Sequence, residues 1–154
     1  MAKEIERKFL VNLAEWKPGS SGVFYRQGYL FTSEKLTVRV RISEEEAILS
    51  IKGEDVGFQR NEYEYSIPVQ DAEEMLELYC EGFIIEKTRY IELINGKRWE
   101  IDVFHGENEG LVLAEIELES MNEEIEIPRW VKEEVTGIAS YYNANLFKNP
   151  YKKW

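Results

Sequence analysis

The sequence is poor in the residue types that build disulfides and zinc sites. Among 154 residues there is one cysteine, Cys80, and one histidine, His105. A single cysteine excludes an intrachain disulfide and predicts a reducing compartment, and a lone histidine without a nearby His or Cys ligand argues against zinc. No apolar run is long enough to cross a bilayer, and the first residues lack the charged-then-apolar pattern of a secretory signal. We therefore expect a cytoplasmic protein without a membrane partner.

Basic residues are also outnumbered. The chain has 30 Asp and Glu against 19 Lys and Arg, a formal net charge of −11. A protein this acidic repels nucleic acid and anionic membranes at long range. The composition therefore predicts no nucleic-acid partner, and any anion must be bound by cations that act locally.

What the chain does contain is the period-two alternation typical of β-strands. Its apolar content of 44% and aromatic content of 13% predict a folded globular protein, and its length suits one domain over residues 1–154. Turn signals such as Asn95-Gly96 separate the alternating runs. The predicted strands, which suit an antiparallel meander, are 3–11, 23–31, 36–43, 46–53, 60–67, 85–94, 97–104 and 111–119.

Capping and stop residues predict a few helices between and after these strands. Asp71 can cap the first helix, with Glu74 completing a capping box, and Pro128 suits the first turn of the second. The fold class is therefore α+β and mainly β. The predicted helices cover residues 71–82, 128–137 and 142–147.

Charged residues gather on one face of each strand. In the first strand Glu4, Glu6 and Lys8 occupy every second position, so their side chains point to the same side. Later strands carry charges of a single sign, basic on some strands and acidic on others. These sets are Arg39 with Arg41, Lys87 with Arg89, Glu62 with Glu64, Glu100 with Asp102, and Glu115 with Glu117 and Glu119.

An ordinary half-buried sheet with a solvated outer face accounts for any one of these strands. Like charges that share one face of a strand repel each other, however, and this destabilises the sheet unless groups of opposite sign lie between them. The segregation of basic and acidic strands therefore favours a closed barrel whose interior brings the two signs together.

One ligand, a polyphosphate bound with a metal ion, can interact with both the basic and the acidic side chains. Arginine binds phosphate oxygens in a bidentate manner and lysine binds them as a point charge. The carboxylates cannot bind phosphate directly, but they suit Mg²⁺ or Mn²⁺, which bridge carboxylate and phosphate oxygens. The candidate phosphate-binding residues are Lys8, Arg39, Arg41, Lys52, Lys87 and Arg89.

The chain resembles the CYTH superfamily, also called the triphosphate tunnel metalloenzymes. The family signature on the first strand is Glu-x-Glu-x-Lys, and Glu4-Ile5-Glu6-Arg7-Lys8 matches it. A segment from Val135-Thr136-Gly137 to Tyr142-Asn143 resembles the family's C-terminal motif, with Tyr142 in place of the usual serine. The other matches follow in the family order: Arg39-x-Arg41, Lys52, Glu62-x-Glu64, Lys87-x-Arg89, Asp102 and Glu115-x-Glu117.

The resemblance implies a closed eight-stranded antiparallel β-barrel that forms a tunnel for triphosphates, with a few flanking helices. It assigns the six cations above to substrate binding and leaves the roles of Glu62 and Glu64 open between metal and water positioning. The catalytic candidates are Lys8, Tyr29, Arg41 and Glu64. The implied metal ligands are Glu4, Glu6, Asp102, Glu115 and Glu117.

Tyr29 rests on a weaker basis than the other candidates. It lies in the segment Gln27-Gly28-Tyr29, on the same strand face as Tyr25, and could approach Lys8. In short bacterial-type members of the family a tyrosine near this place is associated with tripolyphosphatase action. A packed barrel aromatic explains Tyr29 equally well.

The expected activity is metal-dependent hydrolysis of inorganic tripolyphosphate to diphosphate and phosphate. Related activities on the same fold are open: a class IV-type adenylyl cyclase, a thiamine triphosphatase or a nucleoside triphosphatase. A different class of protein, a non-catalytic polyphosphate-binding module, is also compatible with the sequence. A homodimer is possible, but no residue pattern decides it.

Overall fold

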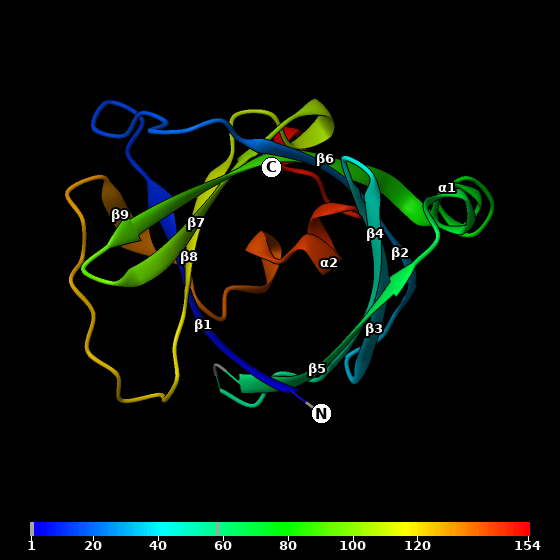
Figure 1. The fold of residues 1–154 in the computed structure, drawn as a ribbon, viewed down its shortest axis with the longest axis horizontal. Coiled ribbons are helices and arrows are strands. Elements are labelled where there is room, and N and C mark those ends of the chain that lie inside the picture. The colour runs from blue at the N-terminus through cyan, green and yellow to red at the C-terminus, as the bar shows by residue number, and fades with distance from the viewer. Residues whose placement is uncertain (1, 58) are drawn as a thin grey trace.

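The chain folds into a closed antiparallel barrel. The computed structural model describes residues 2–57 and 59–154, and the side chains of residues 5–57 and 59–154. In this part of the chain the strands follow the order β5-β4-β3-β2-β6-β7-β8-β1, and β1 pairs again with β5, which closes the sheet (Figure 1). The predicted eight-stranded barrel is confirmed, and a further short strand, β9, is added beside β1.

The strands agree with the sequence prediction to within a few residues at each end. Side chains alternate between the two faces of each strand, and this alternation is visible in the sequence. The pattern therefore locates each strand, and it also fixes the pairing register when one face is buried. The strands are β1 (Ala2–Val11), β2 (Val23–Thr32), β3 (Leu36–Ser43), β4 (Glu46–Gly53), β5 (Gln59–Ile67), β6 (Glu81–Ile94), β7 (Lys97–Phe104), β8 (Val112–Glu117) and β9 (Val131–Glu134).

The helix predicted over residues 128–137 is wrong, since this segment contains β9. Among the described residues, the pairing of β1 with β5 runs from Ala2 to Ile5, and further along β1 the same edge is available to another strand. There β9 takes over, with Phe9 opposite Glu134 and Val11 opposite Val131. Unpaired backbone groups at a sheet edge are costly to bury. Pairing with the edge of β1 is therefore favoured over the helix that the local sequence predicts.

The first predicted helix exists, but its predicted ends are wrong. Helix α1 (Val69–Leu78) begins after Pro68, which occupies the N-cap position, so Asp71 lies inside the first turn. The helix ends before Gly82, which belongs to β6. α1 packs outside the barrel on β2, β3 and β4 (Figure 1). The missing side chain of Gly28 lets α1 and the residues after it approach, because a Cβ there would lie 2.9 Å from Leu76 Cδ2 and 2.4 Å from Cys80 Sγ.

The C-terminal segment enters the barrel. Helix α2 (Asn143–Leu146), close to the predicted third helix, lies within the ring of strands (Figure 1). Short 3-10 turns precede and follow it at Ala139–Tyr141 and Tyr151–Lys153, and a third lies at Gly106–Asn108. Leu146 and Phe147 are fully buried against inward-facing apolar residues of the strands.

The barrel interior is therefore apolar at one end and charged further along. One step along each strand, with its period of two, replaces a charged inward residue by an apolar one: Lys8 is followed by Leu10, Lys87 is preceded by Ile85, Asp102 is followed by Phe104, and Glu115 is preceded by Leu113. Leu146 and Phe147 fill this apolar end, which leaves the charged part of the interior for a ligand.

A separate hydrophobic core covers the outer face of β1, β7 and β8. It contains Phe9, Trp16 and Trp99, with the ring of Trp130 packed edge-on against Trp99. Burying aromatic side chains of this size contributes much of the stability of a small domain. No helix in the described part of the chain has the length and apolar character needed to cross a membrane.

Candidate active site

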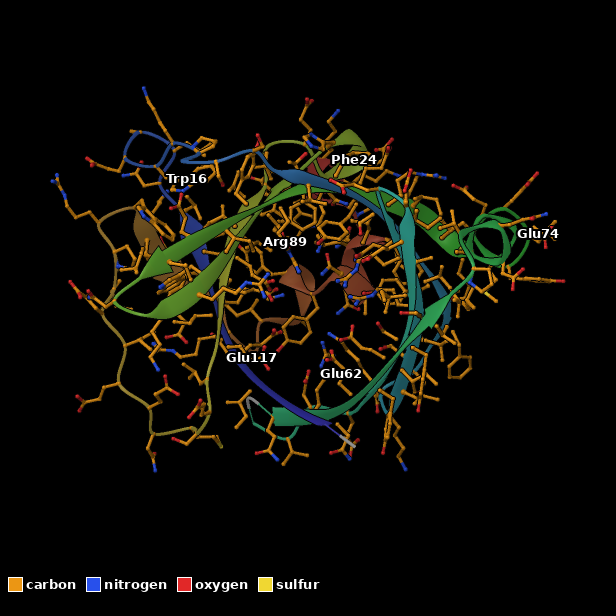
Figure 2. The ribbon with its side chains drawn as sticks, in the orientation of Figure 1. Trp16, Phe24, Glu62, Glu74, Arg89 and Glu117 are labelled. Atoms are coloured by element: carbon orange, nitrogen blue, oxygen red, sulfur yellow. The ribbon has the colours of Figure 1, made fainter. Side chains whose placement is uncertain are left out.

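The charged part of the barrel interior contains a cavity of about 300 Å³. Residues from β1, β2, β3, β4, β5, β6, β7 and β8 line it, as do Tyr142, Asn143 and Ala144 near α2. Figure 2 shows Arg89 and Glu62 reaching into the barrel interior, whereas Glu74 of α1 lies outside. The charged residues that line the cavity are Lys8, Arg39, Arg41, Lys52, Arg60, Arg89, Arg98, Glu6, Glu62, Glu64, Glu100, Glu115 and Glu117.

Most of the predicted site residues thus lie around one cavity. Of the predicted cations, Lys87 is fully buried behind the lining. Tyr29 lines the cavity at its apolar end, where its ring stacks on Phe147 with the centroids 4.9 Å apart. The side chain of Glu4 lies outside the described residues.

Asp102 anchors two of the basic residues. Its carboxylate accepts hydrogen bonds from Lys87 Nζ at 2.9 Å and from Arg89 Nε and Nη2 at 2.7 and 2.9 Å. Burial alone would raise the pKa of Asp102, but Arg89 and Lys87 outweigh burial and lower this pKa to about 2. Burial also lowers the pKa of Lys87, although Asp102 opposes it. The bidentate pair fixes the orientation of Arg89 before any ligand binds.

Lys8 and two carboxylates form a second anchored group. Lys8 Nζ lies 2.9 Å from Glu115 Oε1 and 5.0 Å from the centre of the Tyr142 ring. Burial acts to lower the pKa of Lys8, but Glu115 and Glu6 outweigh it, so the net pKa lies above the usual value. The pKa of Glu115 lies well below the usual value, because Lys8 and Arg89 outweigh the burial of its carboxylate. Lys8 and Glu115 are therefore both charged at neutral pH.

Arg41 lies in an environment that opposes its charge. Burial lowers its pKa, and the neighbouring guanidinium groups of Arg39 and Arg89 lower it further. The ring of Tyr25 offsets part of this repulsion, since its centre lies 4.9 Å from Arg41 Cζ and 5.4 Å from Arg89 Cζ. Three arginines held together in this way form a strong site for a polyanion.

The predicted metal ligands are brought together only in part. Glu6, Glu115 and Glu117 line the cavity, whereas Asp102 is taken up by its two basic partners. Among the residues whose side chains the structure describes, no three acidic, histidine or cysteine side chains are close enough to hold a metal ion as they stand.

Sequence reasoning missed several residues of the cavity. Arg60 and Arg98 continue the alternation of the charged strands, Arg60 before Glu62 and Arg98 before Glu100, so the period-two pattern could have identified them. Tyr142 and Asn143 line the cavity from the C-terminal segment. The sequence assigns these residues only to a C-terminal motif and a short predicted helix, and no local pattern predicts that this segment folds back into the barrel.

A closed antiparallel barrel with cations and carboxylates converging on one interior cavity defines the tunnel-type architecture. The model of the CYTH domain family matches residues 2–149. The chain belongs to this family.

Similar proteins span the same length. A protein of Acetivibrio thermocellus named inorganic triphosphatase is 50% identical over 154 residues, which are 100% of this chain and 99% of the relative. A protein of Nitrosomonas europaea with the same name is 40% identical over 148 residues, covering 93% and 95% of the two chains. A crystal structure of an inorganic triphosphatase matches with a TM-score of 0.69 and 37% identity, covering 96% of this chain and 95% of the other.

Proposed function

We propose that this protein is an inorganic triphosphatase that hydrolyses tripolyphosphate to diphosphate and phosphate with the help of a divalent cation. The observation that carries the proposal is the cavity in which cations and carboxylates from all parts of the barrel converge. The whole-length likeness to two proteins named inorganic triphosphatase supports the same activity.

The aromatic residues of the cavity favour an inorganic substrate over an organic one. Each tyrosine already uses its ring to contact the protein: Tyr25 contacts Arg41 and Arg89, Tyr29 stacks on Phe147, and Tyr142 contacts Lys8. A purine or thiamine ring would have to compete with these contacts in order to stack. A thiamine triphosphatase, a nucleoside triphosphatase or an adenylyl cyclase is therefore less well supported than a tripolyphosphatase.

Two carboxylates suit the proposed cation. Glu6 and Glu115 both line the cavity and both act on the charge of Lys8, so they lie near each other, and Mg²⁺ and Mn²⁺ both prefer oxygen ligands. We expect Glu6, Glu115 and Glu117 to hold the cation, with Glu4 as a further predicted ligand. The predicted ligand Asp102 is instead bound to Lys87 and Arg89. When bound, such a cation neutralises phosphate charge and lowers the pKa of a water ligand.

The residues of this chain would carry out the positioning that phosphoryl transfer mainly requires. Lys8, Arg39, Arg41, Lys52 and Arg89 would bind the phosphate oxygens, and they would stabilise the charge that develops on the diphosphate leaving group. Lys87 would act from behind this lining, through its bond to Asp102. Glu64 would orient the attacking water, and Tyr29 would border the phosphate chain at the apolar end.

The proposal is tested by incubating the protein with tripolyphosphate, ATP and thiamine triphosphate, each with Mg²⁺ or Mn²⁺, and identifying the products. We expect orthophosphate and diphosphate from tripolyphosphate at a higher kcat/KM than from either organic substrate, and no turnover after metal chelation. A cyclic nucleotide formed from ATP would indicate a cyclase. Tight binding of tripolyphosphate without turnover would indicate a binding module.

Arg41→Ala provides the site-directed test. Since Arg41 lines the cavity and would bind phosphate oxygens, kcat/KM should fall on the order of a hundredfold or more. Arg26→Ala is the matched control, because Arg26 pairs with Glu73 of α1 on the outside of the barrel. Wild-type activity in Arg41→Ala would overturn the site assignment.

A further inference from the structure

Three polar residues form a row across β3, β4 and β5 on the inner face of the barrel. The strand register sets Arg39 directly opposite Ser50, and Ser50 directly opposite Glu64. Arg39 and Glu64 line the cavity, whereas Ser50 is only 1% exposed and lies between them. We call these three residues the Arg39–Ser50–Glu64 row.

The hydroxyl group of Ser50 can adopt only one hydrogen-bonding arrangement in this row. Arg39 Nη2 donates to Ser50 Oγ at 3.2 Å, and Ser50 Oγ donates to Glu64 Oε2 at 3.1 Å. A guanidinium group has no acceptor and a carboxylate has no donor, so the hydroxyl must accept from Arg39 and donate to Glu64. The orientation of each charged group therefore depends on the serine between them.

In the neighbouring row the cation lies on β4 itself and pairs directly with a carboxylate of the adjacent strand β5. There Lys52 lies directly opposite Glu62, and Lys52 Nζ contacts Glu62 Oε2 at 3.1 Å. In the Arg39–Ser50–Glu64 row the small hydroxyl separates cation from carboxylate. The hydroxyl makes one hydrogen bond with Arg39 and one with Glu64, and both of these side chains still face the cavity.

Arg39 makes its one side-chain hydrogen bond among the described residues to Ser50. Its side chain is 7% exposed, and its Nε is buried without a hydrogen-bond partner among the described residues. The charge on a buried guanidinium is stabilised by each hydrogen bond it makes. The bond to Ser50 is thus an important restraint on where Arg39 presents its remaining N–H groups.

We propose that Ser50 is a positioning residue that holds Arg39 for phosphate binding and Glu64 for catalysis at the same time. This inference rests on the proposed triphosphatase function. Removing the hydroxyl in Ser50→Ala would let Arg39 and Glu64 approach each other and form a direct ion pair. Such a pair would withdraw the guanidinium group from phosphate and the carboxylate from the attacking water.

The test compares Ser50→Ala with Ser50→Thr in steady-state hydrolysis of tripolyphosphate with Mg²⁺. Because a small misplacement of catalytic groups costs one to two orders of magnitude in rate, we expect kcat of Ser50→Ala to fall by about tenfold to a hundredfold. Ser50→Thr keeps the hydroxyl and should retain kcat within about threefold of wild type. A serine that merely stabilised the fold would lower the unfolding midpoint in Ser50→Ala but leave kcat of the folded protein unchanged.

A binding cycle tests the link to Arg39 separately. In calorimetric titrations with tripolyphosphate, Ser50→Ala should weaken binding by roughly threefold to tenfold in the wild-type background, the loss expected for one misaligned hydrogen-bonded group. In the Arg39→Ala background the same change should have no further effect, since the interaction is already gone. Equal weakening in both backgrounds would show that Ser50 does not act through Arg39.

Ser66→Ala is the matched control, because Ser66 is an exposed serine of β5. It should leave kcat, KM and the unfolding midpoint unchanged. Wild-type kcat and KM in Ser50→Ala, or equal losses in Ser50→Ala and Ser50→Thr, would overturn the inference while leaving the proposed function intact. If the wild-type protein neither binds nor hydrolyses tripolyphosphate, the proposed function fails, and this inference fails with it.

Discussion

At the scale of the residue, Tyr25 supports two cations that repel each other. Its ring lies near Arg41 and Arg89, and removing the ring in Tyr25→Leu would leave both guanidinium groups less well held. At about 0.5–1 kcal/mol for each cation–π contact, KM for tripolyphosphate should rise on the order of fivefold to thirtyfold, whereas Tyr25→Phe should stay close to wild type. Steady-state kinetics check this, with Phe24→Leu as a control at an exposed neighbouring position. A similar KM in Tyr25→Leu and wild type would show that the ring does not position the arginines.

At the scale of the element, β9 is held to β1 by an ion pair that depends on pH. Arg7 Nη2 and Nε donate to the two carboxylate oxygens of Glu134 at 2.7 and 2.9 Å, and this hydrogen bonding lowers the pKa of Glu134. A lowered carboxyl pKa stabilises the fold above the unfolded-state pKa, and the stabilisation is lost as the pH falls through the folded-state pKa. Because both side chains are partly exposed, Glu134→Gln should lower the free energy of unfolding at pH 7 by only about 0.5–1 kcal/mol.

The pH dependence of this difference is the decisive measurement. Urea unfolding of wild type and Glu134→Gln at pH 7, 5 and 3.5 should give curves that converge as the pH falls below about 4. Glu133→Gln changes an exposed neighbour on the same strand and serves as the control. A difference that stays constant over this range would mean that Glu134 contributes through packing and not through its charge.

At the scale of the whole molecule, the C-terminal segment completes the barrel. Phe147 is fully buried, stacks on Tyr29 and accepts a backbone hydrogen bond from Phe83 N at 2.9 Å. Phe147→Ala would open a cavity at the apolar end and should lower the free energy of unfolding by about 3–5 kcal/mol. Denaturant unfolding measures this, with Ile138→Ala at an exposed position as the control. A loss below 1 kcal/mol would show that the segment is not an integral part of the core.

Most of the barrel could be predicted because the sequence pattern of each strand agrees with its place in the tertiary fold. Arg39 and Arg41 alternate with Val38, Val40 and Ile42. This short segment therefore indicates both a strand conformation and which side chains share its apolar face. Residues 128–137 carry a helix-start signal at Pro128, yet their conformation is decided by the open edge of β1. That edge is formed by residues more than a hundred positions earlier, which no local reading can detect.

The strands and the gathering of charge on their inner faces follow from the sequence pattern, because a period of two sends alternate residues to opposite faces. The tertiary structure shows how those charges pair. It set Asp102 between Lys87 and Arg89, and Ser50 between Arg39 and Glu64. It also folded Tyr142 and Phe147 into the interior. These contacts depend on which strands are neighbours and in what register, and that information arises only when segments distant in the sequence meet.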